Sequence, residues 1–239
     1  MLAGRVLVSG SVATKPERLV APSESIHVTG DRPRFVSRGG EKLDAALDAF
    51  AIDVTGSRCL DVGSSTGGFT DRLLQGGARS VVALDVGRGQ LDHSLRTDDR
   101  VTVMEHTDVR NVTPAEIGDV DVVVVDVSFI SLRTVLPAIV RLAEHAPIVA
   151  LVKPQFEVGR GRVGKGGVVR DAELHREAVE GVIAKAVELG WRCDAETPSP
   201  ITGAQGNREF FVLLSGGPRP TDARSVALRE VPPEPRRPS

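Results

Sequence analysis

The chain has 239 residues, of which 41% are hydrophobic and 26% charged, a composition that excludes disorder over most of its length. Two cysteines exclude a disulfide scaffold, no apolar run of about 18 residues predicts a membrane-spanning helix, and the first residues lack a secretory signal pattern. The net charge of −2 gives no bulk attraction to nucleic acid, so an RNA or DNA partner would need a local basic patch.

The chain divides into four segments that differ in residue composition and pattern. Residues 1–30 are turn-rich and β-like, and residues 31–35 form a linker. Residues 36–216 alternate apolar runs with helical patterns and predict one large domain. Residues 217–239 hold six prolines and scattered arginines, which predicts a disordered tail.

Predicted helices and strands alternate within residues 36–216. In chain order they are a helix at 41–50, a strand at 58–62, a helix at 68–75, strands at 80–86, 101–105 and 121–127, a helix at 132–143, a strand at 148–153, a helix at 172–189, and strands at 191–196 and 209–214. The runs VVVVD and IVALVK are typical of strands buried on both faces of a parallel sheet. The alternation predicts a doubly wound α/β sheet, which binds ligands at the carboxyl ends of its strands.

A glycine loop, CLDVGSSTGGFTD at residues 59–71, links the first of these strands to a helix. Its glycines allow a tight turn and close approach to a ligand, but the spacing is neither G-x-G-x-x-G nor a P-loop, which disfavours a dinucleotide or a triphosphate. Asp61, just before the turn, favours a cationic group such as an amino-acid ammonium. The candidate cofactor contacts here are Asp61, Gly63, Ser65, Gly67, Gly68 and Phe69.

Two further acids follow the next two strands. Asp85 is placed to accept hydrogen bonds from ribose hydroxyls, and Asp108 to accept one from an adenine amino group. A nucleoside that carries an amino acid and a positive charge is S-adenosylmethionine, which we therefore predict as the cofactor. The alternative is that these acids are helix caps and turn formers, a common use of aspartate.

Lysine is rare in this chain, which has 25 arginines and five lysines. Where arginine is the default cation, a lysine is more often present for its own chemistry, because lysine can lose its proton and arginine cannot. The five are Lys15, Lys42, Lys153, Lys165 and Lys185.

Four motifs, DVGSSTGGFTD, VVVVDVSFISL, LVKPQFEVG and FVSRGGEKLDAAL, resemble those of the TlyA group. This group, often called hemolysin A, contains ribosomal RNA 2′-O-methyltransferases related to the FtsJ methyltransferases. The resemblance implies an α/β fold, with a Rossmann-like, seven-stranded S-adenosylmethionine-dependent methyltransferase domain preceded by a partial S4-like RNA-binding segment. The helices that normally open an S4 domain are absent from the sequence. The implied substrate is cytidine in 16S and 23S ribosomal RNA, and the implied location is the cytoplasm.

The resemblance also implies a catalytic tetrad, which falls on Lys42, Asp126, Lys153 and Glu209. We expect Lys153 to lie closest to the ribose hydroxyl, either accepting its proton while neutral or stabilising the alkoxide while charged. Asp126 would orient Lys153 and border the cofactor, while Lys42 and Glu209 would hold the ribose. A nearby carboxylate favours the ammonium form and a second lysine opposes it, so the reactive protonation state stays open.

RNA contacts are expected in two segments. Residues 157–170, EVGRGRVGKGGVVR, form a basic, glycine-rich loop directly after a catalytic strand, and the amino-terminal segment adds two cations. The implied partner is ribosomal RNA, naked or within a ribosomal subunit, and the oligomeric state stays open. The predicted RNA-binding residues are Arg5, Lys15, Arg160, Arg162, Lys165 and Arg170.

The remaining chemistry-bearing residues give weaker signals. No histidine or cysteine spacing predicts a metal site, and Cys59 is expected in the core. Phe129 is expected to pack under the glycine loop, with stacking on a base as the alternative. Two rival functions stand beside methyl transfer: an RNA- and cofactor-binding ribosome-assembly protein without catalysis, and a membrane-active hemolysin.

Overall fold

A computed structural model describes residues 6–15, 17–30 and 33–216 of the chain. The chain divides into two compact units, Met1–Arg34 and Phe35–Ser239. The predicted tail at 217–239 and residues 31–32 of the predicted linker lie outside the described residues. No helix in the described segments is long and apolar enough to cross a membrane.

The amino-terminal unit is a small antiparallel sheet with the strand order β2-β1-β3, formed by β1 (Val6–Val8), β2 (Ser11–Val12) and β3 (Ile26–Val28). Ser9 and Gly10 join the first two strands with φ angles of 47° and 81°, the positive values that a tight hairpin turn requires. That this unit corresponds to part of an S4 domain stays a prediction.

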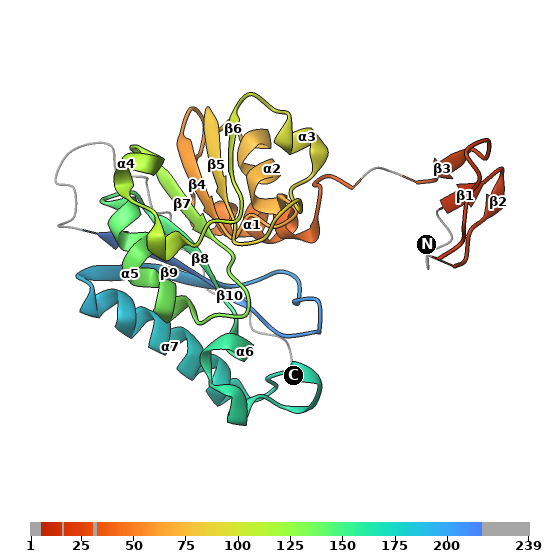
Figure 1. The fold of residues 1–239 in the computed structure, drawn as a ribbon. Coiled ribbons are helices and arrows are strands. Elements are labelled where there is room, and N and C mark those ends of the chain that lie inside the picture. Colours follow the sequence, from red (N-terminus) through yellow and green to blue (C-terminus); the bar gives the residue numbers. More distant parts are fainter. Residues whose placement is uncertain (1–5, 16, 31–32, 217–239) are drawn as a thin grey trace, which may run out of the picture. The chain divides into compact units, whose positions relative to one another are not determined.

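A seven-stranded sheet with the order β6-β5-β4-β7-β8-β10-β9 forms the second unit (Figure 1). Strands β4 to β8 run parallel, and β10 runs antiparallel to both β8 and β9. The predicted seven-stranded α/β fold is confirmed. The strands are β4 (Arg58–Val62), β5 (Ser80–Leu84), β6 (Val101–Met104), β7 (Val122–Val125), β8 (Ile148–Val152), β9 (Trp191–Pro198) and β10 (Phe210–Gly216).

Helices cover both faces of this sheet (Figure 1). Leu43 of α1 and Leu73 of α2 belong to the apolar core on one face, and Ile139 of α5 and Val182 of α7 belong to the core on the other. The α-helices are α1 (Arg38–Ala49), α2 (Gly68–Gln75), α3 (His93–Arg96), α4 (Pro114–Ile117), α5 (Leu132–Ala143), α6 (Pro154–Glu157) and α7 (Ala172–Glu188), with 3₁₀ turns at Val109–Asn111, Arg160–Arg162 and Lys165–Gly167.

Four parallel strands end earlier than the sequence predicts, and one of them, β6 at the edge of the sheet, ends one residue early at Met104. Strand β5 ends before Asp85, β7 before Asp126 and β8 before Lys153. Next to β4, the reason is the turn at Gly63, whose φ of 87° takes the central strand out of the ladder and leaves its neighbours unpaired. The three charged residues therefore sit just beyond the strands, at the edge where a ligand can reach them.

Helix α1 begins three residues before the predicted start at Glu41. Ser37 caps it, its hydroxyl accepting a hydrogen bond from the Gly39 amide at 3.3 Å. Gly39 and Gly40 are poor helix formers, which made an earlier start unfavourable on sequence grounds. A Cβ at Gly40 would lie 2.2 Å from the Phe35 ring, so close packing requires the glycine. The four-residue helices α3, α4 and α6 are too short to show a helical period in the sequence.

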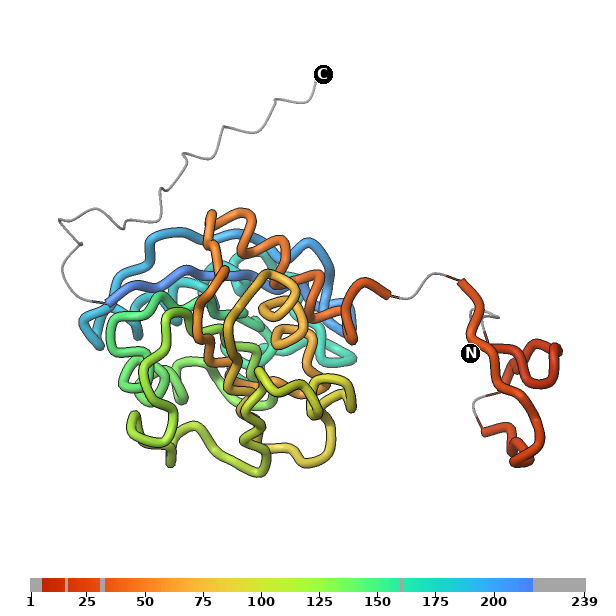
Figure 2. The backbone as a smooth tube through the Cα atoms, turned by 90° about the horizontal axis from the view of Figure 1, so that it is seen from above, coloured from red at the N-terminus to blue at the C-terminus, as the bar shows by residue number. Residues whose placement is uncertain are grey.

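Segments far apart in the sequence meet in this unit. Figure 2 shows α1, drawn in orange, close to the blue strands of the carboxyl-terminal part. The strand order reverses around β4, because the chain continues to β5 on one side and later reaches β7 on the other. The carboxyl ends of β4 and β7 therefore form a topological switch point.

The contact between α1 and α2 depends on Gly68, because a Cβ there would lie 2.2 Å from Ser37 Oγ and 2.9 Å from the Gly40 amide nitrogen. We expect Gly68→Ala to lower the free energy of unfolding by about 1–3 kcal/mol, since the two helix starts must move apart. Gly161→Ala is the matched control, because a Cβ at Gly161 meets nothing within 4 Å. Urea unfolding of both variants measures the difference, and equal stability would contradict the packing argument.

Candidate active site

Two adjoining cavities open at the carboxyl ends of the parallel strands. The first has a volume of about 460 Å³ and the second about 390 Å³. The two cavities share lining residues from the glycine loop after β4 and from the segment after β7, so they adjoin at the switch point. The residues common to both linings are Gly63, Ser65, Asp126, Ser128 and Phe129.

The glycine loop approaches its neighbours too closely for side chains at two positions. Gly63 and Gly67 have φ angles of 87° and 97°. A Cβ at Gly63 would lie 2.6 Å from the Asp126 carbonyl oxygen, and one at Gly67 would lie 2.2 Å from Leu95. The loop is fixed by hydrogen bonds from the Gly63 amide to the Leu84 carbonyl and from the Ser65 amide to Asp85, each 2.8 Å long. It is thus a preformed backbone cradle.

Asp61 lies behind this cradle as a fully buried carboxylate. One of its oxygens accepts a hydrogen bond of 2.6 Å from the Thr70 hydroxyl, and Oδ1 has no hydrogen-bond partner among the described residues. Burial raises the pKa of Asp61 to about 7, and the Thr70 hydrogen bond opposes that rise. Asp61 is absent from the lining of either cavity, although its neighbours in the loop line both.

The other two acids predicted to contact the cofactor line the second cavity. Asp85 accepts hydrogen bonds from the amides of Ser65 (2.8 Å) and Gly87 (2.6 Å), so it also shapes the loop. Asp108 accepts from the Arg110 amide at 3.0 Å, which caps a 3₁₀ turn, and from the Arg110 guanidinium, which lowers the pKa of the Asp108 carboxyl. The contacts of Asp108 are those of a helix cap, which is the alternative to a cofactor contact that the sequence leaves open.

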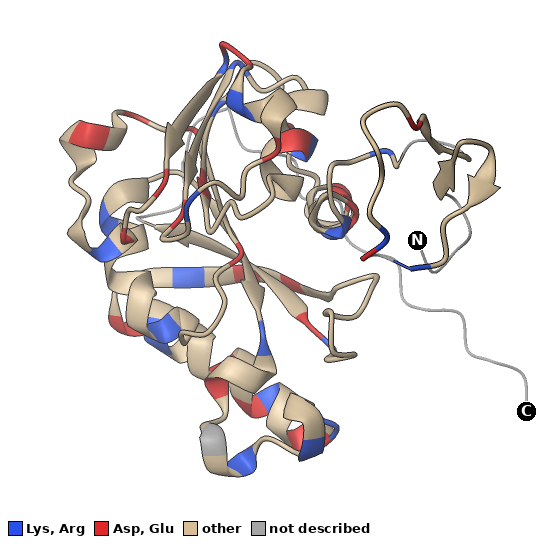
Figure 3. Ribbon diagram, turned by 45° about the vertical axis from the view of Figure 1, so that its right-hand side comes forward, with Lys and Arg blue, Asp and Glu red and all other residues tan. Residues whose placement is uncertain are grey.

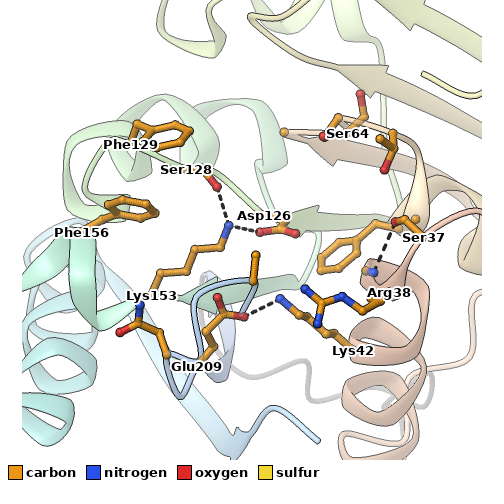
Figure 4. Close-up of a pocket in the computed structure, with 18 of the residues that line it drawn as sticks. Ser37, Arg38, Lys42, Ser64, Asp126, Ser128, Phe129, Lys153, Phe156 and Glu209 are labelled. Atoms are coloured by element: carbon orange, nitrogen blue, oxygen red, sulfur yellow. Dashed lines mark hydrogen bonds and ion pairs between the residues drawn. The ribbon is translucent and has the colours of Figure 1, made fainter. Parts of the chain in front are cut away.

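The four residues of the predicted tetrad all line the first cavity (Figure 4). They form two pairs of opposite charge. Lys42 Nζ lies 2.5 Å from Glu209 Oε2, and Lys153 Nζ lies 2.6 Å from Asp126 Oδ1. Both lysines are nearly buried, with 8% and 9% of their surface exposed. The arrangement can hold a hydroxyl group near two amines and two carboxylates.

Sheet topology explains how Glu209 reaches the site. Strand β10 runs antiparallel to β8, and Phe210 pairs with Val152. The start of β10 therefore lies beside the carboxyl end of β8, where Lys153 follows. Lys42 reaches the cavity from α1, because α1 packs against the start of α2, which follows the glycine loop.

The predicted RNA-binding residues have different surroundings. Lys165 and Arg170 are exposed in the segment after α6, and Lys15 is exposed in the amino-terminal unit. Arg162 forms a two-pronged ion pair with Glu177 of α7, and Figure 3 shows acidic and basic residues mixed around this segment. Arg5 and the side chain of Arg160 lie outside the described residues.

The prediction that Phe129 packs under the glycine loop is wrong. Its side chain is 93% exposed, and its ring lies 5.5 Å from that of Phe156 at the first cavity. The φ angle of 66° at Phe129 turns the chain after β7 away from the core, an unfavourable conformation for a bulky residue. By contrast, Cys59 is fully buried in the core, as expected.

The structure adds several residues that the sequence did not single out. Ser128 accepts a hydrogen bond of 2.7 Å from Lys153 Nζ. Asn207 binds the Val169 amide and the Gly167 carbonyl, each at 2.9 Å, and so anchors the basic segment two residues before Glu209. The sequence could have indicated Ser128 and Asn207, because each lies two residues from a predicted tetrad residue. The other added lining residues are Ser37, Arg38, Gln155 and Phe156. Among the described residues no cluster of His, Cys, Asp or Glu could hold a metal.

Asp61 makes stability depend on pH. Between the unfolded pKa of about 4 and the folded value of about 7, the folded protein keeps a proton that the unfolded chain has lost, so the free energy of unfolding falls as pH rises through this window. We expect Asp61→Asn to be more stable than the wild type above about pH 7, by an order of 1–4 kcal/mol, and the difference to vanish near pH 4.

Denaturant unfolding from about pH 4 to pH 8.5 tests this expectation. The control is Asp53→Asn, because hydrogen bonds from Thr55 lower the pKa of Asp53 and removal of its carboxylate cannot raise stability at high pH. An Asp61→Asn protein that is less stable than the wild type at pH 8 would overturn the assignment of Asp61 as a destabilising buried acid.

Known proteins that are similar in sequence include methyltransferases. Residues 35–215 match the family of FtsJ-like methyltransferases. The chain is 54% identical to the 16S/23S rRNA (cytidine-2′-O)-methyltransferase TlyA of Mycobacterium tuberculosis, over 89% of this chain and 80% of that protein. Two solved structures of proteins described as hemolysins are similar to this chain. The one from Lactococcus lactis has 46% sequence identity and a TM-score of 0.75, and the match covers 78% of this chain and 90% of that one. The one from Streptococcus thermophilus has 42% sequence identity and a TM-score of 0.77, and the match covers 90% of this chain and 80% of that one. The chain belongs to the FtsJ-like methyltransferases and, within them, to the TlyA family.

Proposed function

We propose that this protein transfers a methyl group from S-adenosylmethionine to the ribose 2′-hydroxyl of cytidine in 16S and 23S ribosomal RNA. The observation that carries the proposal is the pairing of Lys153 with Asp126 and of Lys42 with Glu209 around one cavity that continues into the glycine-loop cavity. This is the substrate class printed for the TlyA protein of Mycobacterium tuberculosis.

The residues of the second cavity fit the cofactor. The turn at Gly63 packs directly against Asp126, and Gly63 lines both cavities, so the loop presents its backbone where the cofactor's amino-acid part can lie. Asp61 Oδ1 has no hydrogen-bond partner in the described part of the chain, so this carboxylate behind the loop can attract a cationic ligand. Asp85 would hold the ribose hydroxyls, and the exposed Val86 offers an apolar surface beside the adenine. When bound, the cofactor supplies an electrophilic methyl group on a sulfonium.

The tetrad must align a weak nucleophile and handle one proton. The ribose oxygen forms the new bond to the methyl carbon, the carbon–sulfur bond breaks with its electron pair staying on sulfur, and the hydroxyl proton leaves. Lys153, which lines the first cavity, either takes that proton or stabilises the oxygen while water takes it. Alignment is worth about 7–11 kcal/mol and a positioned base about 10²–10⁴-fold in rate.

Each of the other tetrad members supports Lys153. Asp126 holds the Lys153 amine by charge at 2.6 Å and borders both cavities. Lys42 and Glu209, joined at 2.5 Å, form the far wall and hold the ribose. Each lysine is paired with one carboxylate, so the formal charges of the four groups sum to zero.

The target nucleotide must leave its RNA helix to reach a buried lysine. Phe129 and Phe156 present two rings at the first cavity, next to Ser128 and Lys153 (Figure 4). An extruded base can stack on such a ring, a contact worth about 1–3 kcal/mol. The exposed Lys165 and Arg170, with Lys15 of the amino-terminal unit, supply phosphate contacts. Ribosomal RNA, naked or within a ribosomal subunit, is the proposed substrate, and the cytoplasm is the proposed location.

Methyl transfer from labelled cofactor to ribosomal subunits tests the function, with the site mapped by reverse-transcription stops at low nucleotide concentration. We expect Lys153→Ala to reduce kcat by at least about 100-fold while cofactor binding is retained, because a positioned amine is lost. Lys185→Ala is the matched control, since Lys185 pairs with Glu188 on the surface of α7.

A second outcome distinguishes the rival function. A wild-type protein that binds ribosomal subunits and cofactor without transferring methyl groups would support a ribosome-assembly role instead. Equal transfer rates for the wild type and Lys153→Ala would remove Lys153 from the mechanism.

Stacking on Phe129 is tested separately from chemistry. We expect Phe129→Leu to raise KM for ribosomal subunits about 10- to 100-fold, because the leucine keeps apolar volume but has no ring face. Phe129→Tyr keeps the ring and should behave like the wild type. Cofactor affinity, measured by calorimetry, should be unchanged in both; a loss of cofactor affinity in Phe129→Leu would mean that Phe129 serves the second cavity instead.

A further inference from the structure

Ser128 occupies the junction of the two cavities. It lies between Asp126 and Phe129 in the segment from β7 to α5, and it lines both cavities. Its Oγ accepts a hydrogen bond of 2.7 Å from Lys153 Nζ (Figure 4). The hydroxyl is exposed, so a substrate can approach it from the cavity.

The two contacts of Lys153 Nζ differ in kind. Asp126 Oδ1 lies 2.6 Å away, but the contact lacks hydrogen-bond alignment and is an ion pair held by charge. Coulomb attraction depends on distance and leaves the direction of the N–H bonds free. The hydrogen bond to Ser128 depends on angle, so it sets the rotation of the amine about its last carbon–nitrogen bond.

The segment that carries Ser128 is fixed at both ends. The Asp126 amide donates to the Val62 carbonyl at 2.9 Å. At the other end, the buried carboxylate of Glu157 accepts hydrogen bonds of 2.6 Å from the Ser131 hydroxyl and from the Leu132 amide. Glu157 belongs to α6, the helix that begins immediately after Lys153. The same carboxylate thus ties the segments of the donor and the acceptor together.

We propose that Ser128 is a positioning residue that turns the Lys153 amine so that its one remaining direction, lone pair or N–H, points to the ribose 2′-oxygen. One N–H is directed to Ser128, and a second lies on the Asp126 side. The third tetrahedral direction is a lone pair in the neutral amine and an N–H in the ammonium, and it alone is left for the substrate. This assignment rests on the proposed methyl transfer.

The hydrogen bond also has an electrostatic consequence. A hydroxyl that accepts from the amine favours the ammonium form over the neutral form. The charged groups that face Lys153 are Asp126 after β7, Lys42 and Arg38 of α1, and Glu209 before β10, and none of them is changed by a substitution at Ser128. We therefore expect loss of the hydroxyl to shift one side of the pH–rate profile, the limb that depends on Lys153, to lower pH.

The experiment compares Ser128→Ala, Ser128→Thr and Ser131→Ala with the wild type, measuring kcat and both KM values for methyl transfer to ribosomal subunits across the pH range. For Ser128→Ala we expect a kcat about 10- to 100-fold lower, nearly unchanged KM values, and a limb shifted down by about one pH unit. The acid limb moves if the amine reacts neutral, and the alkaline limb moves if it reacts charged. Ser128→Thr keeps a hydroxyl and should restore both kcat and the limb.

Ser131→Ala is the matched control, because it removes a hydroxyl from the same segment that bonds to Glu157 and not to Lys153. It should lower the melting temperature and leave the limbs in place. The proposal is overturned if Ser128→Ala leaves both limbs unmoved, if its loss lies in KM alone, or if Ser131→Ala shifts the same limb. A wild-type protein without transfer activity in this assay would instead defeat the proposed function.

Discussion

The need to neutralise two buried lysines organises the catalytic unit. Lys42 and Lys153 keep only 8% and 9% of their surface exposed, and a buried ammonium without a partner would cost about 3–5 kcal/mol. Each therefore has a carboxylate within ion-pair distance, and the Lys42–Glu209 pair joins the first helix to the start of the last strand. Placing β10 antiparallel to β8 is what brings Glu209 to the edge where the parallel strands end.

Close backbone approach is the second constraint on the site. Gly63 lets the chain leave β4 against the Asp126 carbonyl, and Gly68 lets α2 start against the cap of α1. These two contacts place the cofactor loop beside Asp126 on one side and beside the helix of Lys42 on the other. The glycine loop and the predicted tetrad therefore depend on the same few backbone contacts, so we expect a substitution at one to disturb the other.

Phe129 has an exposed side chain and a backbone conformation that do not favour folding. A large apolar ring that is 93% exposed, on a residue with φ of 66°, contributes little to the core and keeps an unfavourable backbone conformation. Such local cost is typical of sites that must meet a ligand. The ring faces Phe156 at the rim of the cavity, where an apolar surface is useful only once a substrate covers it.

The sequence by itself determined the order and type of the main elements and the glycine loop, because apolar periodicity and glycine spacing are local signals. The four tetrad residues were predicted from the resemblance of short motifs to a known family. It did not determine where β5 and β7 end, since a strand ends where its neighbour stops pairing, and their shared neighbour β4 turns away at Gly63. Only the tertiary structure decided that Phe129 is exposed and that Ser128 binds Lys153. These outcomes follow from contacts between segments that pack together only after the sheet has formed, and no local pattern of residues encodes them.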